Sequence, residues 1–513
     1  MDRSSLGISQ NSGRVVGNDA IFFYALSAFL IFAPLFWGGV EPLPLLVMEL
    51  AALALLAGQA WWSPALIEQP VSRWTQAFLV LLVLLPLAQL LPVPLTVWSD
   101  LPGRTFYADV LQQAGVGSIG FEWRAISLIP SSTESACLSL LPPLAVFVVA
   151  IGLRGPALLK LVRVFLGIAV GEALLGLIQY GDGPGSRFRL GNDLMGDSAI
   201  GTYINRNHLA GLLEIALPLA LGQLAATVGQ SPRRHIGRRQ QSWRRWLARL
   251  SVARFNQAML FGAMALAILL GLVFTRSRAG VSIAMLSILL CTLLFSNRLG
   301  GRNIHGLLGT LTAIGTGLAS LIGLVPILDR FTLQDPLADG RWRIFDATVQ
   351  AAGQFFPLGS GAGTFEAVMR RFHPPDFPGV TINHDHNDYL EWFLEGGLGA
   401  VCLFAVWSIL YLRQWRRVWA RSAWAPFRFA QVSAGIALLL LMLHSLVDFN
   451  LRIPANTVFA AFLVAVFFHR AAEELTPSHR SKLPDGSDEP GKPRPLNSPP
   501  PIPPENQLNP FSS

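Results

Sequence analysis

The sequence predicts an all-α polytopic membrane protein with about twelve transmembrane helices, and two observations carry this prediction. The first is composition: 52% of the 513 residues are hydrophobic and only 14% are charged, whereas a soluble protein carries roughly 25% charged residues. The second is the recurrence of apolar windows of the length needed to cross a bilayer, about 20 residues for a helix. Twelve windows qualify: 20–40, 43–60, 76–96, 135–152, 158–180, 207–228, 257–275, 279–296, 307–328, 389–411, 430–448 and 455–469.

Two arginine-rich loops orient these expected spans. The loop 229–256 holds eight arginines and the loop 412–429 holds five, and neither contains an acidic residue. Counting spans places both loops on the same side as the two termini, and the positive-inside rule makes that side the cytoplasm. The long loop 329–388 lies opposite and is acidic, with eight Asp or Glu against five Arg. The net charge of +8 therefore reflects topology, and we do not expect a nucleic-acid partner.

The chain divides into one membrane domain and two polar ends. Residues 1–19 are polar, and residues 471–513 are rich in Pro, Ser, Lys and Asp, a composition that cannot bury a core. We expect both ends to be disordered and cytoplasmic, and residues 20–470 to form the membrane domain. The first apolar segment is long and has no small-residue cleavage site after it, so it is interpreted as a retained span rather than a signal peptide.

Polar residues gather where the expected spans meet the outer face. Ionisable groups at the edge of a bilayer are costly and suggest a functional site. The long loop contributes an expected amphipathic helix at 340–350 and a glycine-rich segment at 359–365, which favours a tight turn over a nucleotide motif because no strand precedes it. The clusters are Asn205-Arg206-Asn207-His208, Thr275-Arg276-Ser277-Arg278, Arg341 with Arg343, His384 with His386, and Asp448-Phe449-Asn450-Leu451-Arg452.

Two of these clusters indicate specific chemistry. Arg276 and Arg278 lie in a short outer turn, against the positive-inside rule, and a lipid diphosphate would compensate them because Arg presents a planar fork to phosphate oxygens. Contact with headgroups is the simpler alternative. His384 and His386 lack a set of ligands at zinc spacing, so a general base is more natural, with a helix cap as the alternative. Together these residues favour glycosyl transfer from a lipid-linked diphosphate sugar.

The same residues resemble the O-antigen ligase and polymerase superfamily of bacterial membrane glycosyltransferases. The resemblance runs through most of 200–400 and rests on motifs in a fixed order. These are Asn207-His208-Leu209-Ala210, Ser277-Arg278-Ala279-Gly280, Gly340-Arg341, the run Pro357-Leu358-Gly359-Ser360-Gly361-Ala362-Gly363-Thr364-Phe365, and His386-Asn387-Asp388-Tyr389-Leu390 followed by Glu395 and Gly397. One departure is Ala400, where the last motif usually ends in Gly, and it weakens assignment to the ligase branch.

The resemblance implies a frame of the C-type glycosyltransferase kind and a metal-independent, inverting transfer without a cofactor. It implies that Arg278 and Arg341 hold an undecaprenyl diphosphate and that His386 assists the acceptor hydroxyl. The acceptor would be lipid A core or another glycan, and the site would face the periplasm from the inner membrane. Further substrate contacts are expected from Arg276, Arg343, His384, Asn387, Asn207, His208 and Asp448.

Other functions remain open on the sequence alone. Within the same superfamily the chain could be an O-antigen or exopolysaccharide polymerase or a protein O-oligosaccharyltransferase. A lipid-linked glycan transporter fits twelve spans, but transporters place polar groups at the bilayer midplane, where this chain has few: Glu49, Glu172, Glu214 and His444. A scaffold without catalysis leaves the arginines of the outer turn unexplained.

Overall fold

The computed structural model describes residues 19–62, 71–115, 123–189, 192, 196–229, 252–299, 340–375, 377–419 and 424–470. Within these ranges eight helices are long and apolar enough to cross a membrane, and three shorter apolar helices accompany them. The prediction of an all-α polytopic membrane protein is therefore confirmed. The expected ninth span at 307–328, most of the basic loop and the two polar ends lie outside the described residues, so the count of twelve stays a prediction.

Eleven of the twelve expected spans overlap helices; the third, 76–96, runs past the helix Arg73–Gln89 into the strand Pro92–Pro94, and the first and fourth are interrupted. The first helix ends at Phe32, before the short α2 (Leu35–Gly38), in which Phe36 and Trp37 have left-handed backbones. The fourth is divided at Leu140, just before a Pro pair that supplies no backbone donors. The helices are Asp19–Phe32, α3 (Pro42–Trp62), α4 (Arg73–Gln89), α7 (Pro130–Ser139), α8 (Leu141–Gly152), α9 (Gly155–Asp182), α10 (Arg206–Gly229), α12 (Val252–Phe274), α13 (Arg278–Leu299), α18 (Asp388–Trp419), α19 (Pro426–His444) and α20 (Pro454–Phe468).

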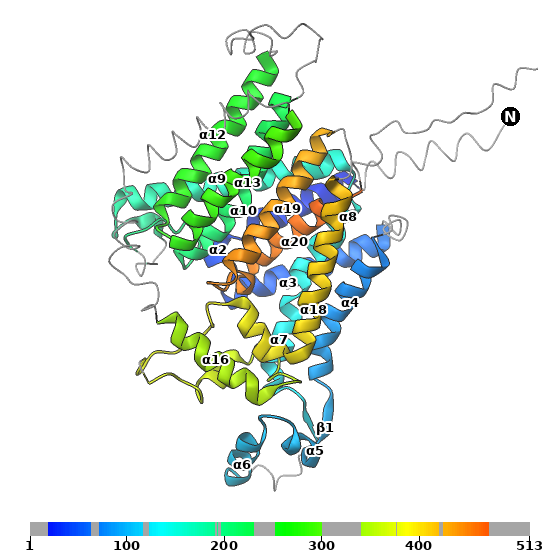
Figure 1. The fold of residues 1–513 in the computed structure, drawn as a ribbon, viewed down its shortest axis with the longest axis vertical. Helices are drawn as coiled ribbons and strands as arrows, with labels where there is room; N and C mark the ends of the chain where they lie inside the picture. Colours follow the sequence, from blue (N-terminus) through cyan, green and yellow to red (C-terminus); the bar gives the residue numbers. More distant parts are fainter. Residues whose placement is uncertain are drawn as a thin grey trace, which may run out of the picture.

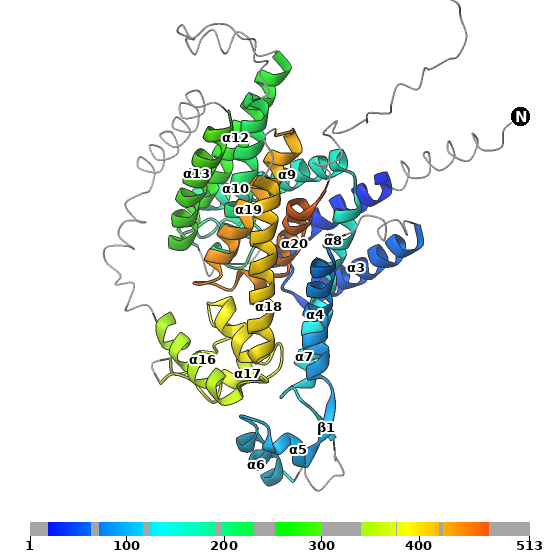
Figure 2. The same cartoon turned by 45° about the vertical axis from the view of Figure 1, so that its right-hand side comes forward.

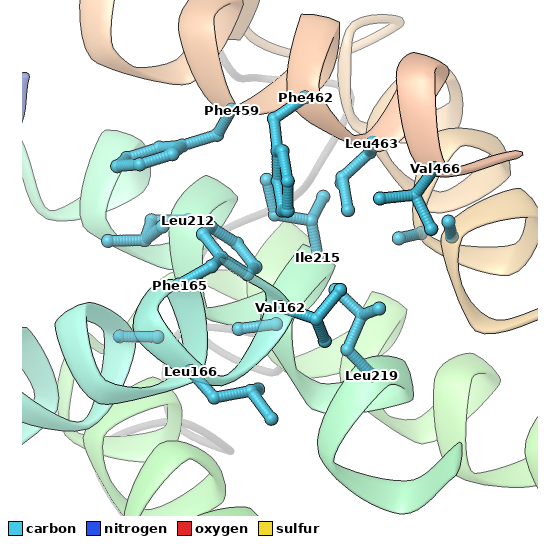
Figure 3. Packing of buried hydrophobic residues seen from close by; sticks show 14 of the residues in the cluster. Val162, Phe165, Leu166, Leu212, Ile215, Leu219, Phe459, Phe462, Leu463 and Val466 are labelled. Carbon is cyan, nitrogen blue, oxygen red and sulfur yellow. The ribbon is translucent and has the colours of Figure 1, made fainter. Parts of the chain in front are cut away.

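Helix α10 is the central element of the bundle. Its span window is 100% buried, because α9, α12, α13 and α19 all pack against it. Figure 3 shows the core around it, in which the side chains of α10 meet those of α9 and α20. In Figures 1 and 2, α12 and α13 lie on one side of the bundle and α4 and α8 on the other, with α19 and α20 between them.

Small residues let these helices approach closely. A Cβ at Gly222 would lie 1.9 Å from Ser433 Oγ, and one at Gly271 would lie 2.6 Å from the Cβ of Ala173. Lipid tails are as apolar as the side chains, so close packing of small residues is a main source of helix association in a bilayer. The glycines of α10 and α12 therefore fix how near α19 and α9 can come.

Three of the ionisable residues inside the spans, Glu172, Glu214 and His444, form contacts with neighbouring segments of the bundle. Glu214 of α10 and His444 of α19 are fully buried and lie 2.8 Å apart, between Oε2 and Nδ1. Glu172 of α9 accepts hydrogen bonds from both the backbone N–H and the hydroxyl of Thr202. Each carboxyl group thus joins its helix to a neighbouring segment, as expected for polar groups inside a membrane protein.

The polar segments form a layer at one end of the bundle, at the bottom of Figures 1 and 2. Strands β1 (Pro92–Pro94) and β2 (Trp123–Ala125) pair antiparallel there, a small feature that an all-α expectation missed. The buried Arg104 joins two polar segments, because its guanidinium donates to the carbonyls of Ile126 and Gly359. The other elements of this layer are α5 (Leu95–Asp100), α6 (Thr105–Gln113), α16 (Arg341–Phe355) and α17 (Phe365–Met369).

The glycine-rich segment is a turn that docks on α18. Gly359, Gly361 and Gly363 all have positive φ angles, of 80°, 116° and 75°. Ser360 and Gly361 donate backbone hydrogen bonds to Leu394 and Glu395 of α18. A Cβ at Gly359 would lie 2.2 Å from the carbonyl oxygen of Glu395. The prediction of a tight turn before a helix is confirmed, and this turn places α16 and α17 against α18.

Candidate functional site

Three helices that are far apart in the chain begin with arginine and meet at one cavity. Arg206 opens α10, Arg278 opens α13 and Arg341 opens α16. All three line a cavity of about 90 Å³ together with Asn207, Arg276, Ser277 and Ala279. A helix N-terminus presents unpaired N–H groups and about half a positive charge, which favours anions. Four guanidinium groups and three helix starts thus converge, and none of the described residues that line the cavity is acidic.

The outer turn between α12 and α13 is held in an unusual conformation. Arg276 has a φ angle of 55°, which costs energy for a residue with a side chain and persists only where neighbours impose it. Its neighbours do so: Ser277 N–H donates to Thr275 Oγ1, and Gly280 N–H donates to Ser277 Oγ, which caps α13. The turn therefore fixes both arginines that flank Ser277.

Arg276 is partly compensated by groups beside the cavity. Its Nη1 lies 3.1 Å from Asp197 Oδ2, and its Nη2 donates to the hydroxyl of Tyr180 over 3.3 Å. Asp197 also approaches Arg206, with 3.6 Å between Oδ1 and Nη1. Asp197 is half exposed, so its attraction is screened by solvent. Arg276 is thus positioned by protein partners at the edge of the cavity.

Asp448 joins the arginine cavity to the histidine motif. Its carboxylate is buried, and Oδ2 accepts a 2.6 Å hydrogen bond from Asn207 Nδ2 and lies 3.8 Å from Arg341 Nη2. On the other oxygen, Oδ1 lies 3.6 Å from His386 Nδ1 and 3.9 Å from His208 Nε2. Arg341 is further fixed by a 2.7 Å hydrogen bond from Nη1 to the carbonyl of Val447.

The charge state of Asp448 follows from these neighbours. Burial alone would raise the pKa of this carboxyl group, but contact with His386 and the nearby His208, His444 and Arg341 outweigh burial and hold the pKa well below its usual range. Asp448 is therefore ionised at any working pH. A buried carboxylate of this kind orients the groups around it as well as neutralising them.

His386 is presented to solvent by a strained backbone. Its φ angle is 57°, and its side chain is 28% exposed. Because Nδ1 faces the carboxylate of Asp448, the tautomer that places a proton on Nδ1 is favoured, and this leaves the lone pair of Nε2 available. The arrangement is that of a base whose orientation is set by an acid, a pairing used to activate hydroxyl groups.

Phe449 forms a hub for three imidazole rings. The ring of His384 stacks on it at 4.5 Å between centroids, and the rings of His208 and His386 meet it edge-on at 4.8 and 4.9 Å. Phe449 follows Asp448 directly, so one short turn supplies both the carboxylate and the apolar surface that hold His386. The sequence analysis did not select Phe449, and nothing in its spacing points to this role.

The remaining predicted residues have structural partners. His384 Nδ1 lies 3.0 Å from Glu391 Oε1, which also meets Arg452. The Oδ1 atom of Asn387 accepts the backbone N–H groups of Tyr389 and Leu390 and so caps α18. Arg343 is exposed on α16, about 200° around the helix from Arg341, and does not line the arginine cavity.

The structure therefore brings together Arg276, Arg278, Arg341, Asn207, His208, His386 and Asp448, and it adds Arg206. Arg206 belongs to the polar cluster Asn205-Arg206-Asn207-His208 of the sequence, but it was not selected there as a site residue. No group of three or more His, Cys, Asp or Glu side chains suited to a metal occurs among the described residues.

Fold and site together define a polytopic, mainly helical membrane protein with an arginine-lined cavity and a histidine–carboxylate pair at one end. The O-antigen ligase family model matches residues 263–405, which confirms over this segment the resemblance drawn from the motifs. The matched segment contains Arg278, Arg341 and His386, whereas Arg206, Asn207 and Asp448 lie outside it. A search of curated proteins found no match.

Proposed function

We propose that this protein is a glycosyltransferase that moves a glycan from undecaprenyl diphosphate to an acceptor hydroxyl at the periplasmic face. The observation that carries the proposal is the link through Asp448, whose two oxygens face Arg341 of the arginine cavity and His386. A diphosphate and a hydroxyl would thus be held on either side of one buried carboxylate. The family match supports a membrane enzyme of the O-antigen ligase type.

In the proposed reaction the arginine cavity binds the diphosphate of the donor. Arg278 and Arg341 form charge-assisted hydrogen bonds to its oxygens, and the starts of α10, α13 and α16 add positive potential. Charge builds on the diphosphate as the bond between the anomeric carbon and its oxygen breaks. Preorganised cations stabilise that charge in the transition state, so they lower the barrier as well as binding the donor.

His386 supplies the other half of the reaction. Its Nε2 takes the proton of the acceptor hydroxyl while the acceptor oxygen forms a bond to the anomeric carbon. Undecaprenyl diphosphate leaves with the electron pair of the broken bond, and the proton remains on the imidazole until it passes to solvent. Attack from the face opposite the leaving group inverts the anomeric configuration. Asp448 stabilises the imidazolium and keeps the ring oriented, and the scheme requires no metal and no cofactor.

A reconstituted assay tests this proposal. Purified protein in lipid is given a carrier-linked glycan and, in separate reactions, lipid A core, a second carrier-linked glycan or a protein with exposed hydroxyls. The proposal predicts a new glycosidic bond with one acceptor class and release of undecaprenyl diphosphate in equal amount. Passage of the glycan into vesicles without bond formation would instead identify a transporter.

A further inference from the structure

A cavity between apolar helices of the bundle lies away from the arginine cavity and has no place in the scheme above. It measures about 360 Å³ and lies between α4, α7, α8, α18, α19 and α20, within the roughly 300–1,000 Å³ of ligand pockets. No residue lines both cavities. Helix α13, which lines the arginine cavity, and helix α4, which lines this one, lie on opposite sides of the bundle in Figures 1 and 2.

The wall of this cavity fits a hydrocarbon chain. Its lining is mainly aliphatic and aromatic, with Leu82 and Leu85 of α4, Leu144 of α8 and Ala461 of α20 among its members. Leu82, Leu85 and Trp407 are partly exposed, so the cavity can be reached from the surface of the bundle. Because these helices are membrane spans, what surrounds that surface is lipid.

One end of the cavity is polar and carries no excess positive charge. Arg452 lines it, with Nη2 2.6 Å from Glu395 Oε2 and Nε 3.2 Å from Glu391 Oε1. Two buried carboxylates thus face one guanidinium, which disfavours a diphosphate there. Trp392 also lines this end, and its buried indole N–H has no hydrogen-bond partner among the described residues. That donor suits an ester, ether or hydroxyl oxygen.

The polar end lies beside the histidine motif. Leu451 and Arg452 line the cavity and follow Asp448 and Phe449 in one short turn, while Glu391 connects Arg452 to His384. An occupant with its chain in this cavity would bring its head group to the side of the 448–452 turn opposite the arginine cavity. From there a hydroxyl group could approach His386 without competing for the diphosphate site.

We propose that this cavity holds a hydrocarbon chain of the acceptor, and that the acceptor is therefore a glycolipid whose group at this depth is uncharged. That the occupant of this cavity is the acceptor rests on the proposed function, whereas the presence of a lipid chain in the cavity does not. The charge contrast between the two cavities separates the two lipids: four arginines receive the donor diphosphate, and an end whose Arg452 is neutralised by Glu395 and Glu391 receives a neutral glycolipid.

Photolabelling of the full-length protein in lipid nanodiscs tests the chain site directly. The probe is a monoglycosyl diacylglycerol with a diazirine in one acyl chain, and adducts are mapped by mass spectrometry. We expect adducts on α4 and α20, reduced at least fivefold by Ala461→Phe, which fills the cavity, and reduced less by Ala461→Val. The matched control, Ala51→Phe, fills a separate apolar cavity on α3 and should leave labelling unchanged.

Two other probes define the outcomes that overturn the proposal. Equal labelling of α4 and α20 by a diazirine-bearing undecaprenyl diphosphate would assign the cavity to the donor tail. Equal labelling by a diazirine-bearing phosphatidylcholine would mean that bulk lipid fills it. In transfer assays, Ala461→Phe should raise KM for the glycolipid about tenfold and leave kcat unchanged. Transfer of the glycan to a protein at a rate that Ala461→Phe does not change would also contradict the proposal that the acceptor is a glycolipid.

The proposed function can fail separately. If inorganic diphosphate does not bind to the wild-type protein, or binds equally well to Arg278→Ala, the arginine cavity is not a donor site. The labelling result for the glycolipid probe would still stand in that case, because it depends on the cavity between α4 and α20 alone.

Discussion

Asp448 is the residue on which the site depends, because a single buried carboxylate faces an arginine from α16, an asparagine and a histidine from α10, and the histidine motif. Removing one member of such a network leaves the others buried and unpaired, which costs more than the lost contact itself. Substitutions around Asp448 should therefore affect activity far more than their distance from the substrates suggests.

Arg341 and Arg343 provide a matched pair on the same helix. Arg341→Ala removes one cation from the cavity and is expected to lower kcat for transfer by about 10²–10³-fold, the usual effect of losing one preorganised donor. Arg343→Ala removes an equal charge from the exposed face of α16 and should change kcat by less than about threefold, because solvent screens that charge. Steady-state kinetics with the carrier-linked donor measures both, and equal losses would contradict the assignment.

Asp385 provides a prediction about pH and stability. Burial raises the pKa of this carboxyl group to about 8, and its Oδ1 accepts the hydroxyl of Thr348 on α16. The folded protein therefore keeps a proton that the unfolded chain loses above about pH 4, so the free energy of unfolding falls as pH rises from about 4 to about 8. Above that range the carboxylate is charged, and the free energy of unfolding falls no further on account of Asp385.

Asp385→Asn removes the titrating proton and keeps an oxygen for Thr348. In thermal unfolding we expect the Tm of this variant to exceed that of the wild type at pH 9, with a smaller or reversed difference at pH 5. Asp346→Asn, at an exposed position on α16, is the control and should shift Tm little at either pH. A higher Tm for the wild type than for Asp385→Asn at pH 9 would show that ionisation of Asp385 does not destabilise the folded protein.

Among the elements, α10 links packing to chemistry. Its Gly211 faces polar side chains of the turn after α19 and of α20: a Cβ at Gly211 would lie 2.2 Å from Asn450 Oδ1 and 3.1 Å from Asn456 Nδ2. Asn450 follows Asp448 by two residues and opens the 3-10 turn Asn450–Arg452. The close approach of α10 to this turn thus determines the position of the Asp448 carboxylate.

Gly211→Ala should therefore displace the turn that begins at Asn450 and so impair glycosyl transfer. Alanine favours a helix by about 1 kcal/mol over glycine, so any loss of stability or activity must come from the clash with Asn450. We expect kcat to fall at least tenfold and Tm to fall. The control is Gly262→Ala on α12, where a Cβ would meet nothing within 4 Å, and this variant should keep full activity with an equal or higher Tm.

The sequence predicted the elements better than it predicted their ends. Apolar windows found the helices because lipid requires long apolar runs whatever their packing, but they could not show that the first helix stops at Phe32. Motif order selected Arg341 and His386, which the structure places around one carboxylate, and Arg278, which lines the arginine cavity. It did not show that Asn387 caps α18 or that His384 pairs with Glu391, although these partners lie within seven residues in the chain. The contacts of Asp448 with Asn207 and Arg341 could not be read from the sequence, because only the folded chain brings these residues near.

At the scale of the whole molecule, the proposed orientation can be tested directly. The extracytoplasmic layer should contain Arg343, and the far end of α18 should place Arg413 in the cytoplasm. In a variant with Cys137, Cys291 and Cys402 replaced by Ala, Arg343→Cys should react with a membrane-impermeant maleimide in intact spheroplasts, since this residue is exposed. Arg413→Cys, also exposed, should react only after permeabilisation, and the reverse pattern would place the site in the cytoplasm.

The contact between Asn207 and Asp448 closes over 241 positions of the chain, and this has a consequence for biogenesis. A nascent chain that has inserted through α18 already carries the arginines and the histidine but still lacks Asp448. The ring of His386 then has no carboxylate to orient it, and Arg341 has no buried counter-charge. If the protein acts as proposed, competence for transfer is acquired only when the chain has been translated through α19 to Asp448, and an unfinished chain on the ribosome is expected not to transfer.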